Sequence, residues 1–86
     1  MKHLEKPLKA VANQRRLEIL KYLKEKKAAT VGELAEHIKL SFKSTSKHLA
    51  VLLGADIVLK EQQGSFVLYA LAPKLPLVAK SILSIL

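Results

Sequence analysis

The chain has 86 residues, half of them hydrophobic, which is enough for one small domain with a modest core. It contains no cysteine, so disulfides, thiolate metal sites and cysteine nucleophiles are all excluded. The formal net charge of +8 favours a polyanionic partner such as nucleic acid, although lysines that serve only solubility explain the charge about as well.

No segment predicts export or membrane insertion. Residues 1–10 lack the uninterrupted apolar stretch of a signal peptide. The most apolar segment, residues 75–86, contains Lys80 and is too short to span a bilayer. We therefore expect a cytoplasmic protein with no membrane partner.

The first predicted helix lies within residues 1–12. Leu4, Leu8 and Val11 have the i, i+4, i+7 spacing of an amphipathic helix. We expect Pro7 in the first turn or just before the helix, because a missing backbone N–H is tolerated there.

Two further helices follow, each with a capping residue at its start. Asn13 is the predicted N-cap of a helix that runs to about Lys24. Thr30 and Glu33 have the spacing of a capping box, in which each side chain binds the other residue's backbone N–H. The third helix is therefore predicted to begin after Thr30 and to end near Ile38.

The fourth predicted helix spans residues 41–53, with Ser41 as its cap, and has two dissimilar faces. Thr45, Leu49 and Leu52 share one face and should pack inward. The other face carries short polar and cationic side chains, namely Lys43, Ser44, Ser46 and Lys47. Residues 39–54 contain no acidic residue, which favours entry into a DNA major groove over an ordinary solvated face.

The hydrophobic period changes after the fourth helix. Residues 57–71 read as two strands joined by a turn at 62–65, where Gly64 supplies any positive φ. A last helix over residues 75–86 completes the order. Helices, then a hairpin, then a helix predict a mainly α fold with a small β-hairpin, a winged helix-turn-helix formed by residues 1–86 as a single domain.

The last helix is more apolar than a helix packed on one domain requires. Seven of its apolar side chains span roughly 160° of the helical wheel, while the apolar Leu77 lies on the remaining face; the seven are Leu75, Val78, Ala79, Ile82, Leu83, Ile85 and Leu86. Such a surface indicates a dimer interface, and the alternative is a cap over the chain's own core.

Three stretches, "LKAVANQRRLEIL", "TVGELAEHIKLSFKSTSKHLAVL" and "GSFVLYAL", occur in the order and spacing of one known family. Across residues 8–71 the chain resembles the ArsR/SmtB-type transcriptional repressors. The resemblance implies a homodimer in which residues 1–12, with Leu4 and Leu8, and the C-terminal dimerisation helix pack across a two-fold axis. It also implies that helix 41–53 enters the major groove of double-stranded DNA while the two-stranded wing lies on flanking backbone or minor groove.

The predicted DNA contacts are Ser41, Phe42, Lys43, Ser44, Ser46 and Lys47 on the helix, with Lys60, Gln62, Gln63 and Ser65 on the wing. The wing should contribute modestly, because wings in this family often carry arginine near the turn and this one does not.

The metal sensors of the family have no counterpart in this sequence. The resemblance implies cysteines in the helix near residues 30–38, or Asp and His in the last helix, and neither is present. His3, His37 and His48 lie on separate elements, a pattern more typical of surface histidines than of a zinc site. We expect no metal and no cofactor, and the effector ligand, if there is one, is unknown.

These patterns predict a dimeric, sequence-specific DNA-binding regulator, a repressor that reads a pseudo-palindromic operator. An enzyme is not expected, because the sequence shows no carboxylate pair, Ser-His-Asp set or glycine-rich phosphate loop. The alternative is a winged helix used for protein–protein interaction without DNA binding. Phe42 keeps it open, since a large aromatic is unusual among polar groove contacts. If the protein binds DNA, we expect Phe42 to pack instead on a thymine methyl group or on Leu40.

Overall fold

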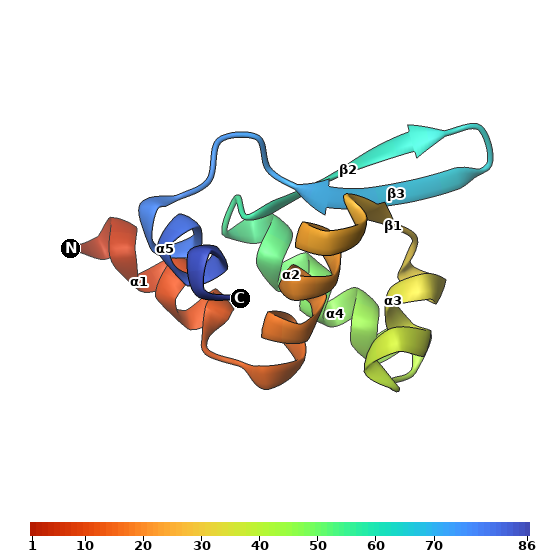
Figure 1. The fold of residues 1–86 in the computed structure, drawn as a ribbon, viewed down its shortest axis with the longest axis horizontal. Coiled ribbons are helices and arrows are strands. Elements are labelled where there is room, and N and C mark those ends of the chain that lie inside the picture. The colour runs from red at the N-terminus through yellow and green to blue at the C-terminus, as the bar shows by residue number, and fades with distance from the viewer.

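The protein is elongated, with the wing tip at one end and the N-terminus at the other (Figure 1). The computed structural model describes residues 1–86 and has principal-axis extents of 39 × 24 × 21 Å. The elements in order are α1 (Lys2–Val11), α2 (Gln14–Lys26), β1 (Ala28–Ala29), α3 (Val31–Ile38), α4 (Phe42–Gly54), β2 (Val58–Gln63), β3 (Phe66–Leu71) and α5 (Leu77–Ile85). The prediction of a mainly α winged helix-turn-helix fold is confirmed.

Helices α2, α3 and α4 begin at the capping residues that the sequence predicted. The side chains of Asn13, Thr30 and Ser41 accept hydrogen bonds from the backbone N–H three residues ahead, at 3.1, 3.2 and 3.0 Å. Glu33 completes the capping box by accepting from the Thr30 N–H at 2.9 Å. These caps satisfy donors that every helix start would otherwise leave unpaired, so they fix where each helix begins.

The core is built around α2, which lies in the middle of the molecule (Figure 1). Its fully buried side chains include Ile19 and Leu20. Thr45, Leu49 and Leu52 of α4 are also fully buried, as their shared helix face predicted. The hydroxyl of Thr45 donates to the Ser41 carbonyl at 2.9 Å, so burial leaves no polar atom of this side chain unpaired.

The predicted two-stranded wing belongs to a three-stranded antiparallel sheet with the order β1-β3-β2. The added strand, Ala28–Ala29, pairs with Ala70 and Tyr69 of β3. Two small residues show no period-2 pattern, which is why the sequence did not predict this strand. Strand β1 ties the base of the wing to the segment that leads into α3.

The hairpin turn consists of Gly64 and Ser65. The register places Gln63 opposite Phe66, so only these two residues connect the strands. Gly64 has a φ of 61°, and the expectation that it supplies the positive φ is confirmed.

The boundaries of the outer helices correct two expectations. Helix α1 begins at Lys2, which places the buried Pro7 inside the helix and not in its first turn. The proline is tolerated because the hydrogen bond it removes is that to the carbonyl of His3, an exposed residue near the helix start. Helix α5 begins at Leu77, two residues later than expected, because Pro76 in extended conformation precedes it.

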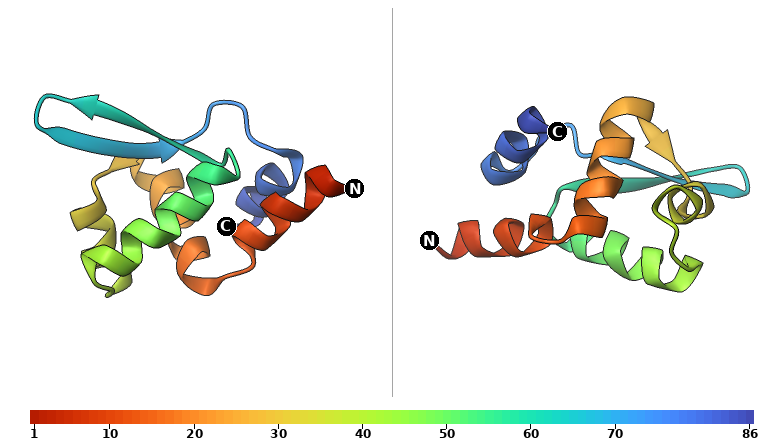
Figure 2. Two further views of the ribbon diagram at one scale, coloured as in Figure 1. Left: turned by 180° about the vertical axis from the view of Figure 1, so that it is seen from behind. Right: turned by 60° about the horizontal axis from the view of Figure 1, so that its bottom comes forward.

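Helices α1 and α5 lie side by side at the end of the molecule away from the wing tip (Figure 2). Ala79 and Leu83 of α5 were both expected at a dimer interface, but they are buried in the core of the single chain. A hydrogen bond also connects the backbone of α5 to α2, since Lys24 Nζ donates to the Leu83 carbonyl at 2.7 Å. One face of α5 therefore covers this chain, and only its remaining face is open to a partner.

Two glycines provide a matched pair of stability tests. Gly64→Ala should lower the free energy of unfolding by about 1 kcal/mol, because an L side chain is strained at positive φ. Gly32→Ala, in the first turn of α3, should raise it by up to roughly 1 kcal/mol, since the new Cβ meets Thr30 Oγ1 at 3.9 Å, an ordinary contact. Urea denaturation at one fixed protein concentration measures both changes, and a shift in the same direction for both would contradict this account.

Candidate nucleic-acid interface

Helices α3 and α4 form the helix-turn-helix, and the turn between them is tight. Lys39 adopts a left-handed conformation, with φ 57° and ψ 48°, directly after α3. The next residue, Leu40, donates its N–H to the Ala35 carbonyl at 3.1 Å. This closes the end of α3 and directs the chain into the Ser41 cap of α4.

The outward face of α4 has the composition that the helical wheel predicted. Lys43 and Lys47 are exposed, and Ser44 and Ser46 on their flanks are half-buried. Phe42 is 64% exposed, so contact with Leu40 does not bury its ring. The structure thus presents these side chains on one surface, while the predicted contacts themselves stay a prediction.

Ser41 is exposed and is also the N-cap of α4. Its hydroxyl oxygen accepts the N–H of Ser44 as the cap of α4. The backbone N–H groups of Phe42 and Lys43 lie in the first turn, where a helix offers no internal acceptor. This end of α4 is therefore suited to a phosphate, with Lys43 adjacent.

The wing presents a weaker surface for DNA. All four predicted contacts on it, Lys60, Gln62, Gln63 and Ser65, are exposed. However, Gln62 Nε2 donates to the Gly64 carbonyl at 2.8 Å, so its amide group braces the turn. Glu61, also exposed, follows Lys60 in β2, so the strand carries an acidic as well as a basic side chain. These features agree with a modest contribution from the wing.

The sequence did not predict how α4 is connected to α1 and α2. Arg16 of α2 places Nη1 3.1 Å from Nδ1 of His48 on α4. Its Nε donates to the Ala10 carbonyl at 2.6 Å and its Nη2 to the Lys9 carbonyl at 3.3 Å. One guanidinium therefore joins the last turn of α1 to α4.

His48 must be neutral for this contact to be a hydrogen bond. The guanidinium only donates, so Nδ1 of His48 accepts and the ring proton sits on Nε2. Burial, and then the charges of Arg16 and Arg15, lower the pKa of His48 below its usual value of 6.5. The partner of His48 lies 32 residues away in the chain and left no sequence signal.

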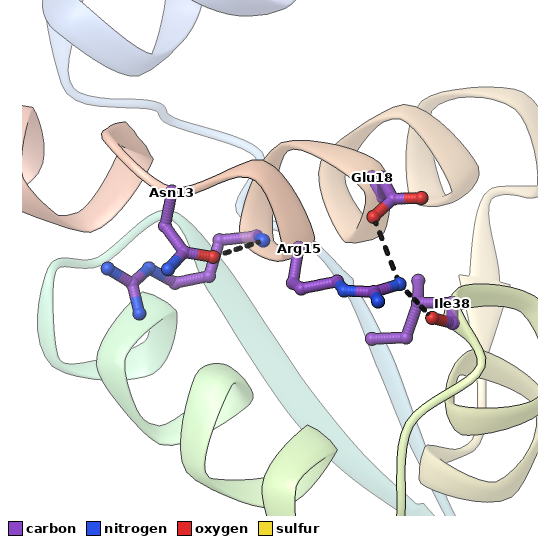
Figure 3. Close-up of polar contacts among 5 residues, drawn as sticks. Asn13, Arg15, Glu18 and Ile38 are labelled. Atoms are coloured by element: carbon purple, nitrogen blue, oxygen red, sulfur yellow. Dashed lines mark hydrogen bonds and ion pairs between the residues drawn. The ribbon is translucent and has the colours of Figure 1, made fainter.

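The neighbouring arginine holds the other helix of the pair (Figure 3). Arg15 Nη1 donates to the carbonyl of Ile38, the last residue of α3, and lies 3.5 Å from Glu18 Oε1. A cation at this helix end satisfies a free carbonyl and complements the helix dipole. Arg15 and Arg16 thus attach α3 and α4, respectively, to the start of α2.

The family comparison decides the class of protein. A family model described as "Bacterial regulatory protein, arsR family" matches residues 13–60. The chain belongs to this family. It is a DNA-binding transcriptional regulator and not an enzyme, as the sequence predicted.

Relatives of this arsR-family regulator agree with the assignment. The arsenical resistance operon repressor of Bacillus subtilis (strain 168) is 34% identical over 71 residues, which are 83% of this chain and 68% of that protein. The transcriptional repressor SdpR of the same strain is 36% identical over 63 residues, 73% of this chain and 69% of that protein. The transcriptional activator HlyU of Vibrio cholerae is 40% identical over 65 residues, 76% of this chain and 59% of that protein. None of these names supports the alternative of a protein-interaction module.

Solved structures resemble the whole chain. Reduced HlyU from Vibrio cholerae superposes with a TM-score of 0.83 at 32% identity, covering 98% of this chain and 84% of that one. A homodimeric winged helix-turn-helix DNA-binding domain from Mycobacterium bovis gives a TM-score of 0.84 at 25% identity, covering 98% and 75%. The similarity of this arsR-family regulator to these structures therefore extends through α5.

Two further findings concern clusters of metal-ligating side chains and helices long and apolar enough to span a membrane. The regulator brings no three His, Asp or Glu side chains together in a way that would hold a metal ion. Its helices are all too short or too polar to cross a bilayer.

The Arg16–His48 contact predicts a pH-dependent stability. The folded-state pKa of His48 lies below the unfolded value, so the unfolded chain binds more protons and stability should fall as the pH drops below about 6.5. In thermal denaturation between about pH 7.5 and pH 5, His48→Gln should lose less stability than the wild type, because Gln does not protonate. His3→Gln, an exposed position on α1, is the control and should behave as wild type. If His48→Gln lost as much stability as the wild type over this pH range, His48 would not be the group responsible.

Proposed function

We propose that the protein is a homodimeric repressor that reads a pseudo-palindromic operator by placing α4 of each protomer in the major groove. The observation that carries this proposal is the acid-free, exposed face of α4, on a helix whose other face is anchored in the core. Basic and short polar side chains at this position match base-edge acceptors and phosphates.

The proposed contacts fall into two groups. Lys43, Lys47 and the first turn of α4 at Ser41 provide the positive charge for phosphates and base acceptors. Ser44 and Ser46 provide hydroxyls short enough to let the helix approach the groove floor. Gln63, Ser65 and Lys60 of the wing would add contacts to flanking backbone, with Gln62 mainly bracing the turn.

The proposed dimer interface lies at the α1–α5 end. Large apolar side chains are exposed there, with Leu77 73% exposed, Ile85 79% and Leu8 49%. Exposed apolar surface does not stabilise an isolated chain, whereas a second copy of the chain would bury it. The proposed interface residues are Leu4, Leu8, Leu75, Leu77, Val78, Ile82, Ile85 and Leu86, with Ala79 and Leu83 packed beneath them in the same chain. The similar Mycobacterium bovis domain is described as homodimeric, which supports a dimer.

The direction of regulation is also part of the proposal. A dimer of this size on an operator would block access to overlapping promoter DNA, and two relatives are named repressors. HlyU is named an activator, so a reporter gene fused to the bound promoter is the appropriate test of direction. We also propose that the regulator acts in the cytoplasm, where a bacterial regulatory protein meets its DNA.

Charge reversal tests the DNA-reading face. Lys43→Glu with Lys47→Glu should weaken binding to a duplex selected from a random pool by on the order of a hundredfold, since two favourable contacts become repulsive. Lys21→Glu with Lys26→Glu, two exposed residues of α2, changes the net charge equally and should bind far more tightly than the α4 variant. The log–log salt slope should also be shallower by about two for the α4 variant. If both double variants lost the same amount of DNA affinity, binding would depend only on the net charge of the protein. That result would contradict the proposal.

Sedimentation equilibrium tests the dimer. The wild type should be a dimer at micromolar concentration, and Leu77→Glu with Ile85→Glu should give a folded monomer, because buried charges in the interface are costly. Val67→Glu on the wing, also an exposed apolar position, should remain dimeric. A monomeric wild type would overturn the interface.

A further inference from the structure

Both phenylalanines of the chain lie on its surface, and they lie together. Phe42 on the first turn of α4 and Phe66 at the tip of β3 are each 64% exposed. With Val31 and Val67 they line an open hollow of about 350 Å³ between the starts of α3 and α4 and the wing tip. The protein has only four aromatic residues, so it leaves half of them uncovered at this place.

The charges around the hollow favour a negatively charged partner such as DNA over a neutral or basic protein surface. Lys43 follows Phe42 directly, and residues 39–54 contain no acid. The acidic residue of the adjoining α3 turn, Glu33, has a carboxylate oxygen bound to the Thr30 N–H. The hollow is therefore an apolar recess on a basic surface, next to a helix start that is suited to phosphate.

The position of Phe42 selects the chemical group that would fill the recess. In a helix-turn-helix the N-terminal residues of the second helix contact base edges. The apolar group that a base edge presents in the major groove is the C5-methyl of thymine. A phenyl ring cannot hydrogen-bond to a base, so methyl contact is what it contributes to readout.

We propose that Phe42 reads a thymine C5-methyl group in each half-site, while Phe66 and Val67 close the far side of the recess over the neighbouring deoxyribose. This inference rests on the proposed function and adds a base preference to it. Burial of one methyl group corresponds to about a fourfold change in affinity, and two half-sites together give roughly fifteenfold.

A thymine-to-uracil scan tests the inference, because uracil keeps every hydrogen-bonding group of thymine and lacks only the methyl. The probe is a duplex selected by the wild type from a random pool, with symmetric thymine pairs replaced by uracil one pair at a time. One replacement should weaken wild-type binding by roughly fifteenfold. Phe42→Ala should bind the thymine and uracil duplexes equally, about as tightly as the wild type binds the uracil duplex.

Phe66→Ala is the matched control, since it removes an equally exposed phenylalanine from the other wall. It should weaken both duplexes alike and keep the thymine-to-uracil ratio. Circular dichroism should show both variants folded, because neither ring is in the core.

Two results would overturn the inference and leave the proposed function intact. They are a wild type indifferent to every uracil replacement, and a Phe42→Ala variant that keeps the wild-type ratio. The first is also the outcome expected if the recess serves a protein partner. A wild type that selects no duplex at all would instead overturn the proposed function, and this inference with it.

Discussion

The geometry of the proposed DNA-reading surface depends on two adjacent arginines in the first turn of α2. Arg15 donates to the Ile38 carbonyl at the end of α3, and Arg16 lies 3.1 Å from the His48 ring nitrogen on α4. Both contacts are between side chains and groups more than twenty residues away, so they fix tertiary positions that no local signal sets. Apolar packing alone would hold α3 and α4 against the core, but directional hydrogen bonds restrict how each helix is rotated about its axis. In the proposed complex, the rotation of α4 about its axis decides which side chains reach the floor of the DNA groove.

Arg16 also ties the two ends of the molecule together. The same guanidinium that meets His48 donates to the carbonyls of Ala10 and Lys9 in the last turn of α1. Helix α1 packs beside α5 at the proposed dimer interface (Figure 2). A shift of α1 in the dimer would therefore act on α4 through Arg16 as well as through the direct packing of α1 on α4.

The sequence predicted those features of the fold that are local. Caps at Asn13, Thr30 and Ser41 were predictable because each cap binds a backbone N–H only three residues away. The inward face of α4 followed from helical periodicity for the same reason. Contacts that depend on tertiary placement were not predictable: Arg16 with His48, the two-residue strand β1, and the burial of Ala79 in its own chain. The helical wheel shows that α5 is broadly apolar, but it does not show which part of that surface the chain covers for itself.

The central claim is that two copies of α4 read DNA together. Hydroxyl-radical footprinting on duplexes selected from genomic fragments tests it most directly, because it reports both binding and geometry. The account predicts two protected half-sites related by a dyad, with centres about one helical turn, ~10 bp, apart. Protection of a single half-site, of two half-sites in direct repeat, or of no duplex at all would contradict it.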